Sequence, residues 1–198
     1  MYVLSSYCQN EIIIKKSRFL SEAFAVTSPE SAREIIKMQK QKYKDSNHVV
    51  HAFVIGKEKS ILGSSDDGEP KGTAGRPALL VLQHSPITNI MITITRWFGG
   101  VLLGTGGLVK AYTDSTKALL DVATLKELKS ERCLKIICSY REVDFILNIL
   151  EKTDANILNK AYTQNVEYLV IIPEENTKAL VHHLNDNTRA FVEEIIST

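Results

Sequence analysis

A β-branched run that leads through a glycine-rich turn into an amphipathic segment constrains this chain more than any other feature of its sequence. Residues 89–95 read NIMITIT, which is typical of a buried strand. Apolar or small residues recur near the helical period from Leu108 to Val122, after a turn that contains five glycines. We therefore expect a strand over residues 89–95, a helix over residues 104–123, and a fold in which helices pack against a sheet.

The segments before this strand carry strand and helix signals in alternation. Residues 11–27 are rich in β-branched and aromatic side chains and predict one or two strands, interrupted at residues 15–17. A hydroxyl, a proline and a glutamate at residues 27–30 predict the start of a helix that ends near Tyr43. Residues 48–56 and the segment around Ile61 are predicted to pair as strands, and a short helix is expected over residues 76–83.

The last third of the chain has the order strand, helix, strand, strand, helix, strand. The expected strands are residues 133–139, 155–162, 166–172 and 190–196, and the expected helices are residues 141–152 and 174–185. This βαββαβ order is the split βαβ arrangement, in which an antiparallel sheet carries two helices on one face. With the charged residues 126–132 as a linker, we predict an α+β protein of two domains, residues 1–128 and 132–198.

The balance of charge excludes a chain built mainly to coat nucleic-acid phosphates, because 24 basic residues face 23 acidic ones. The first 130 residues hold 17 basic and 12 acidic residues (17 − 12 = +5), and the remainder holds 7 and 11 (7 − 11 = −4). Either the first part is the better place to seek an anionic ligand, or the asymmetry arises by chance. No apolar run is long enough to span a membrane and no leader segment is recognisable, so we expect a cytoplasmic protein.

The three cysteines predict reduced thiols. Cys133 and Cys138 have opposite parity in one expected strand and therefore face opposite sides of the sheet, which leaves Cys8 without a partner. An odd number with this spacing favours structural thiols in a reducing compartment.

The first segment that core packing does not explain is SSDDGEPKGTAGRP, residues 64–77. It can present the carboxylates of Asp66, Asp67 and Glu69 together with Thr73 and the guanidinium of Arg76. In the alternative interpretation it is an irregular surface turn in which Thr73 caps the short helix. The three acids could hold a hard cation such as magnesium, but three carboxylates in one loop are a weak signal, and we predict neither a metal nor a cofactor.

The second segment is TRWFGGVLLGTGGLVKAY, residues 95–112. The free amides at a helix N-terminus attract phosphate or carboxylate, and Arg76, Arg96 and Lys110 would add full charges. In the alternative interpretation the glycines only let helix and sheet backbones pack closely; they are Gly99, Gly100, Gly104, Gly106 and Gly107. Neither a phosphate-binding loop with its lysine nor a dinucleotide fingerprint is present.

Histidines and serines give no further site. His48 and His51 are three residues apart in an expected strand, so they point to opposite faces and are better interpreted as structural residues. No G-x-S-x-G sequence occurs, and nothing in the sequence brings a serine and a histidine together.

Taken together, these segments resemble the Impact/YigZ family. The resemblance rests on residues 16–19, His48, and residues 64–70, 72–77, 95–100 and 103–112, and it covers about residues 1–125. The βαββαβ unit that follows resembles the second domain of the bacterial YigZ branch. Two departures occur, Trp97 where tyrosine is usual and Val101–Leu102 where the family usually has a basic residue.

The resemblance implies the fold of each domain. The first would share the fold of a ribosomal small-subunit protein domain and of domain IV of elongation factor G. The second would resemble that factor's C-terminal, ferredoxin-like domain. Eukaryotic relatives regulate translation under amino-acid starvation by competing for the activator of a kinase.

Three functions follow as hypotheses. The leading one is a cytoplasmic, non-catalytic protein that binds RNA, the ribosome or a translation-associated protein with the face around Arg18, Arg76, Arg96 and Lys110. The second is an enzyme for a small phosphorylated or acyl substrate, in which the three acids supply a base or a metal site and the amides of residues 104–107 stabilise negative charge. The third is a protein-interaction module whose glycines serve packing alone. The sequence specifies neither the partner nor the oligomeric state.

Overall fold

The structure is a computed structural model that describes residues 1–195, and it confirms an α+β chain of two domains. Two compact units divide the chain, Met1–Leu128 and Lys129–Thr198. Each unit has its own sheet and its own hydrophobic core.

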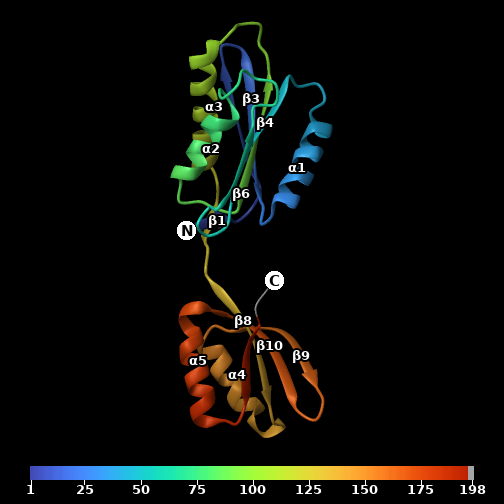
Figure 1. Cartoon of the computed structure of the whole chain (residues 1–198), viewed down its shortest axis with the longest axis vertical. Helices are drawn as coiled ribbons and strands as arrows, with labels where there is room; N and C mark the ends of the chain where they lie inside the picture. The colour runs from blue at the N-terminus through green and yellow to red at the C-terminus, as the bar shows by residue number, and fades with distance from the viewer. Residues whose placement is uncertain (196–198) are drawn as a thin grey trace. The chain divides into compact units, whose positions relative to one another are not determined.

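The first unit is built on a five-stranded antiparallel sheet with the order β2-β3-β6-β4-β5. Helices α2 (Gly75–His84) and α3 (Gly104–Asp121) cover one face of this sheet, and α1 (Pro29–Lys42) covers the other (Figure 1). The strands are β2 (Cys8–Ile14), β3 (Ser17–Ala25), β4 (His48–Ile55), β5 (Ile61–Ser65) and β6 (Ile90–Trp97). The strands and helices predicted in this region are therefore confirmed, with ends that move by one to a few residues.

Strand β6 lies at the centre because its side chains suit two covered faces. Ile90, Ile92 and Ile94 are fully buried in the core beneath α2 and α3. Met91 points to the other face and packs in a smaller core beneath α1, with Ala32 of that helix. A strand between two layers needs apolar residues of both parities, and the run of residues 89–95 supplies them.

The face beneath the second half of α1 is polar instead. Glu22, Thr93 and His51 lie in register across β3, β6 and β4 and form a row. The carboxylate of Glu22 accepts hydrogen bonds from the Tyr7 hydroxyl (2.7 Å) and from Lys42 (2.9 Å). Burial alone would raise the pKa of Glu22, but these hydrogen bonds outweigh it and lower the pKa. Within residues 1–195, several buried atoms of this face have no hydrogen-bond partner: Glu22 Oε2, Gln39 Oε1, His51 Nδ1, Thr93 Oγ1 and Thr95 Oγ1.

The predicted linker over residues 126–132 is wrong at both ends. Leu125–Glu127 form β7, which pairs antiparallel with β1 (Tyr2–Leu4), and β8 begins at Glu131. The short strands pair because Leu4 is buried in the first core and Leu125 packs against that core. Only residues 128–130 lie between β7 and the second unit's first strand.

The second unit confirms the predicted βαββαβ order. Its four-stranded antiparallel sheet has the order β11-β8-β10-β9, and α4 and α5 lie on one face of it (Figure 1). Its elements are β8 (Glu131–Cys138), the 3-10 turn η1 (Tyr140–Glu142), α4 (Val143–Lys152), β9 (Asn156–Tyr162), β10 (Val166–Pro173), α5 (Glu174–Asn187) and β11 (Phe191–Ile195). The expected last strand extends to Ile196, which lies outside the described residues. All three cysteines are free thiols, as predicted.

Candidate functional site

Four connections of the first unit meet at one end of its sheet, which we call the loop end. They are residues 15–16, 43–47, 66–74 and 98–103. The antiparallel register brings them together, because Arg18 lies opposite Trp97 and His48 opposite Arg96. Side chains join them further: the Asn47 side-chain oxygen accepts a hydrogen bond from the backbone N–H of Phe98 at 2.7 Å.

The two unusual segments of the sequence line one cleft at the loop end. This cleft, which we call the motif cleft, has a volume of about 440 Å³. The acidic segment contributes Gly68, Glu69 and Pro70, and the glycine-rich segment contributes residues from Arg96 to Leu108. The full lining is Asn47, His48, Gly68, Glu69, Pro70, Arg96, Phe98, Leu102, Leu103, Gly104, Thr105 and Leu108.

A buried ion pair forms the floor of the motif cleft. Arg96 is 5% exposed, and its guanidinium donates to Glu69 Oε1 at 2.7 Å. The Tyr112 hydroxyl donates to the same oxygen at 2.7 Å, and Arg96 also donates to Ser17 Oγ at 3.2 Å. Burial and the nearby Glu69 carboxylate raise the pKa of Tyr112. This corrects the expectation that Arg96 is free to bind an anion, because Glu69 already neutralises its charge.

His48 lines the same cleft and is held by a backbone carbonyl. Its Nδ1 lies 2.8 Å from the carbonyl oxygen of Asp67, which can only accept, so Nδ1 carries the proton. Its Nε2 lies 3.9 Å from Glu69 Oε2. Gly68 lies against the imidazole with φ +88°, so a side chain there would be strained. His51 lies on the α1 face, so the prediction of opposite faces for the two histidines is confirmed.

Asp66 caps helix α2. Its carboxylate accepts hydrogen bonds from the backbone N–H groups of Gly72 (2.7 Å), Ala74 (3.1 Å) and Gly75 (2.8 Å). Burial alone would raise the pKa of Asp66, but these backbone hydrogen bonds outweigh it and lower the pKa. The expectation that Thr73 caps this helix is wrong, since its hydroxyl donates to the carbonyl of Pro70 instead (2.7 Å).

The three predicted acids point in different directions and do not form one site. Asp67 accepts a hydrogen bond from the N–H of Val49 at 2.7 Å and pairs with Lys40, whereas Asp66 faces α2 and Glu69 faces Arg96. Among residues 1–195, no group of three or more His, Cys, Asp or Glu side chains is arranged to hold a metal ion. The enzyme hypothesis relied on acids without a structural duty, and each of these carboxylates has one.

The glycines of the second segment divide between the two interpretations. A Cβ on Gly99 would lie 2.0 Å from the carbonyl carbon of Lys16, so this glycine permits close packing of two backbones. Gly100 and Gly104 have φ of +82° and +71°. A Cβ at Gly106 would meet open space, and a Cβ at Gly107 would lie 3.2 Å from the Cβ of Leu103. Helix α3 begins at Gly104 without a side-chain cap. Its first-turn amides therefore remain the candidate anion seat of the motif cleft.

The remaining predicted cations are exposed but differ in their partners. Arg18 lies 4.1 Å from the Trp97 ring centroid and pairs with Glu11 at 2.8 Å, and Lys110 pairs with Asp114 at 2.5 Å. Arg76 has no hydrogen-bond or ion-pair partner in residues 1–195. The sequence interpretation missed further exposed cations on the loop end, which are Lys15, Lys16, Lys44 and Lys71.

Exposed apolar side chains on the connection of residues 98–103 were also missed. Phe98 is 46% exposed, Val101 40% and Leu102 83%. Their signal was available, because an apolar run among glycines in a turn has no helix or strand face with which to bury itself. The loop end therefore presents both cations and apolar groups to solvent.

Comparison with known proteins identifies the family. The Impact N-terminal domain matches residues 15–120, and a domain of unknown function (DUF1949) matches residues 136–190. An IMPACT family member from Haemophilus influenzae is 36% identical over 178 residues, which cover 88% of this chain and 86% of the relative. The chain belongs to the IMPACT family. The resemblance drawn from the motifs is thereby confirmed.

Other relatives of the IMPACT family cover nearly the same length. YigZ of Escherichia coli is 34% identical over 178 residues, which cover 89% of this chain and 87% of the relative. A crystal structure titled as that of a hypothetical protein aligns over 100% of this chain and 98% of its own, with 30% identity and a TM-score of 0.73. In the part of the chain that the structure describes, no helix is long and apolar enough to cross a membrane.

Proposed function

We propose that this IMPACT-family protein is a cytoplasmic, translation-associated binding protein that engages RNA at its loop end. The observation that carries the proposal is that exposed cations and exposed apolar groups lie together on the connections of the loop end, where the motif cleft opens. The role in translation rests on the family resemblance, since eukaryotic relatives regulate translation. The buried Glu69–Arg96 pair supports the cleft and does not contact the ligand.

The charged groups suit a phosphate backbone. Lys16 and Lys44 are exposed on two connections of the loop end, and Lys71 and Arg76 are exposed on the acidic segment. Each phosphate contact releases condensed counterions, so binding should weaken steeply as salt rises. The uncapped first turn of α3 adds backbone donors beside these side chains.

Phe98 supplies a feature that a purely electrostatic surface lacks. Its ring is 46% exposed next to the cleft, and aromatic rings stack on unpaired bases with about 1–3 kcal/mol per base. Single-stranded or looped RNA exposes such bases, whereas a regular duplex does not. We therefore expect single-stranded RNA to bind more tightly than duplex RNA of the same length.

Fluorescence anisotropy with a labelled single-stranded RNA tests this proposal. The full chain should bind at about 50 mM salt and lose affinity by an order of magnitude or more at about 200 mM. The variant Lys16→Glu/Lys44→Glu should bind at least about tenfold more weakly and show a smaller dependence on salt. Phe98→Ala should weaken binding with little change in the salt dependence.

A matched control separates the loop end from net charge. Lys37→Glu/Lys178→Glu changes the net charge by the same amount at exposed positions on α1 and α5. This control should bind RNA within about twofold of the original chain. Equal losses in the two double variants, or no binding of the original chain at about 50 mM salt, would contradict the proposal.

A further inference from the structure

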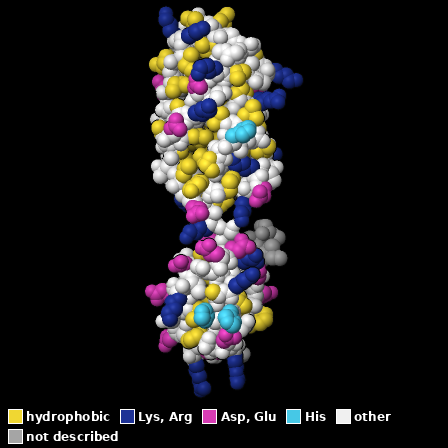
Figure 2. Space-filling model, turned by 90° about the vertical axis from the view of Figure 1, so that its left-hand side faces the viewer, with side chains coloured by type: hydrophobic (Ala, Val, Ile, Leu, Met, Phe, Trp, Pro, Cys, Tyr) yellow, Lys and Arg dark blue, Asp and Glu magenta, His cyan; other side chains and the backbone are white. Residues whose placement is uncertain are grey.

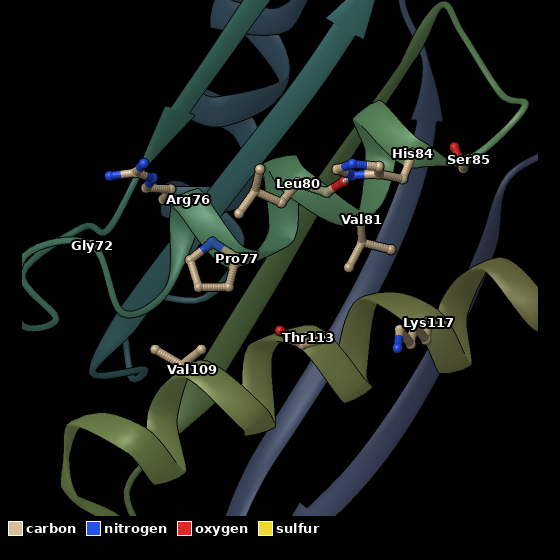
Figure 3. A pocket seen from close by; sticks show the side chains of 10 residues that line it. All are labelled: Gly72, Arg76, Pro77, Leu80, Val81, His84, Ser85, Val109, Thr113 and Lys117. Atoms are coloured by element: carbon tan, nitrogen blue, oxygen red, sulfur yellow. Dashed lines mark hydrogen bonds between the residues drawn. The ribbon is translucent and has the colours of Figure 1, made fainter.

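A second hollow of the first unit lies between α2 and α3 and has a volume of about 760 Å³. Pro77 and Val81 of α2 and Val109 of α3 point into the space between the helices (Figure 3). Leu80 is 44% exposed and Val109 39% exposed, so the hollow is an open groove with apolar walls. Among residues 1–195, the residues that line this hollow differ from those that line the motif cleft.

Basic side chains stand at both ends of this groove. Arg76 lies at one end, and His84 and Lys117 lie toward the other (Figure 3). None of the described residues that line the groove is acidic. Figure 2 shows apolar side chains interspersed with Lys and Arg, and with some Asp and Glu, on the face of the first unit that it presents.

The cations of this groove lack the carboxylate partners that several other cations of the first unit have. Arg18, Lys40, Lys42 and Lys110 each pair with a carboxylate. Arg76 and Lys117 pair with no acidic side chain of residues 1–195. Two unpaired cations beside exposed apolar walls are complementary to a ligand that is both apolar and anionic.

The length of the groove restricts the ligand further. Arg76 and His84 lie at its two ends and are eight residues apart on one helix, so they are roughly 12 Å apart along its axis. A fatty acid has one carboxylate and cannot pair with both ends. None of the described residues that line the groove is Phe, Tyr or Trp, the rings on which unpaired bases most often stack, so RNA fits the groove poorly. A helix with acids about two turns apart and apolar residues between them satisfies both ends and the walls.

We infer that the groove between α2 and α3 binds an acidic amphipathic helix of a partner protein. Apolar side chains of that helix pack against Leu80, Val81 and Val109, and its flanking carboxylates pair with Arg76 and Lys117. The inference does not depend on RNA binding at the loop end, because the two surfaces use different residues apart from Arg76.

Selection from a displayed library of helical 15-residue peptides tests this inference, with the full chain as bait. Enriched peptides should carry apolar residues at helical spacing with Asp or Glu on both sides. One enriched peptide is then synthesised with a fluorophore, and a second version carries Lys in place of its acids. The acidic version should bind, and the basic version should bind at least about tenfold more weakly.

Variants of the full chain then locate the peptide. Leu80→Glu and Lys117→Glu should each weaken binding about tenfold or more. Met38→Glu and Lys37→Glu are matched controls on exposed positions of α1, across the sheet, and should change binding less than about twofold. The variant Lys16→Glu/Lys44→Glu should leave peptide binding intact while it weakens RNA binding, so failure of one proposal is distinguishable from failure of the other.

Four outcomes would overturn the inference. The first is a selection that does not enrich acidic peptides, and the second is an enriched peptide that binds Leu80→Glu as tightly as it binds the original chain. The third is displacement of the bound peptide by dodecanoate at a lower concentration than any unlabelled acidic peptide needs. The fourth is a dimer of this chain that Leu80→Glu dissociates. The last two would assign the groove to an acyl chain or to a second copy.

Discussion

The buried ion pair beneath the motif cleft makes the sharpest stability prediction. In the variant Arg96→Met the Glu69 carboxylate, whose side chain is 3% exposed, keeps the Tyr112 hydroxyl at 2.7 Å but loses its counter-charge. Removal of one partner from a buried pair costs about 3–5 kcal/mol, because the other charge stays buried and uncompensated. The cost of Glu69→Gln should lie in the same range, since this variant leaves the Arg96 guanidinium without its carboxylate.

The double variant distinguishes an ion pair from simple packing. Glu69→Gln/Arg96→Met removes both charges, so its cost should be smaller than the sum of the single costs by about 1.5–3 kcal/mol. Arg33→Met is the matched control, because it breaks an exposed pair in which the side chains are 72% and 69% exposed, and it should cost less than about 1 kcal/mol.

Urea unfolding followed by tryptophan fluorescence measures these costs. The chain has one tryptophan, Trp97, which follows Arg96 in β6, so the signal reports the first unit and not the second. Single variants that lose less than about 1 kcal/mol, or a double variant whose cost equals the sum, would refute the assignment of a coupled buried pair.

Three further variants and a ligand screen test other parts of the first unit. Gly99→Ala should destabilise strongly, because its Cβ would lie 2.0 Å from a backbone atom of Lys16, whereas Gly106→Ala, whose Cβ meets open space inside α3, should stabilise by about 0.5–1 kcal/mol in the same urea assay. Asp66→Asn should cost about 1–2 kcal/mol of stability at pH 7. Because the folded-state pKa of Asp66 is lowered, the stability that its carboxylate contributes is present above the unfolded pKa of about 3.9 and is lost as the pH falls below it. The unfolding curves of the variant and of the original chain should therefore converge in acid. In a thermal-shift screen, divalent ions should not raise the melting temperature; stabilisation by such an ion that Glu69→Gln abolishes would revive the enzyme hypothesis.

Local periodicity explains which parts of the fold the sequence predicts. Residues 89–95 and 104–123 gave β6 and α3 because strand and helix repeats are visible within one segment. Strands β1 and β7 were missed because each has three residues, too few for a period, and Tyr2 pairs with Glu127 from the far end of the domain. Long-range pairing of short strands leaves no local signal.

The sequence suggested which segments form the candidate site, but the anion-binding role that it gave to Arg96 was wrong. The sequence placed the acidic and glycine-rich segments in one hypothesis, but their meeting depends on the order β3-β6-β4, which no local pattern specifies. The burial of Arg96 was readable, since it shares the parity of Ile90, Ile92 and Ile94 and must face the same core. An arginine on that face needs a buried carboxylate, and Glu69 provides it.

Because of the polar row beneath α1, this helix should separate from the sheet more easily than α3 does. Helix α3 packs on the larger hydrophobic core of the unit. The second half of α1 instead covers Glu22, Thr93 and His51, each of which has a buried side-chain atom without a hydrogen-bond partner in residues 1–195. Lifting that half of α1 would expose little apolar surface and would let water bond those atoms. The amide hydrogens in the second half of α1 should therefore exchange with deuterium through small local fluctuations, whereas those of α3 should exchange only when the whole unit unfolds.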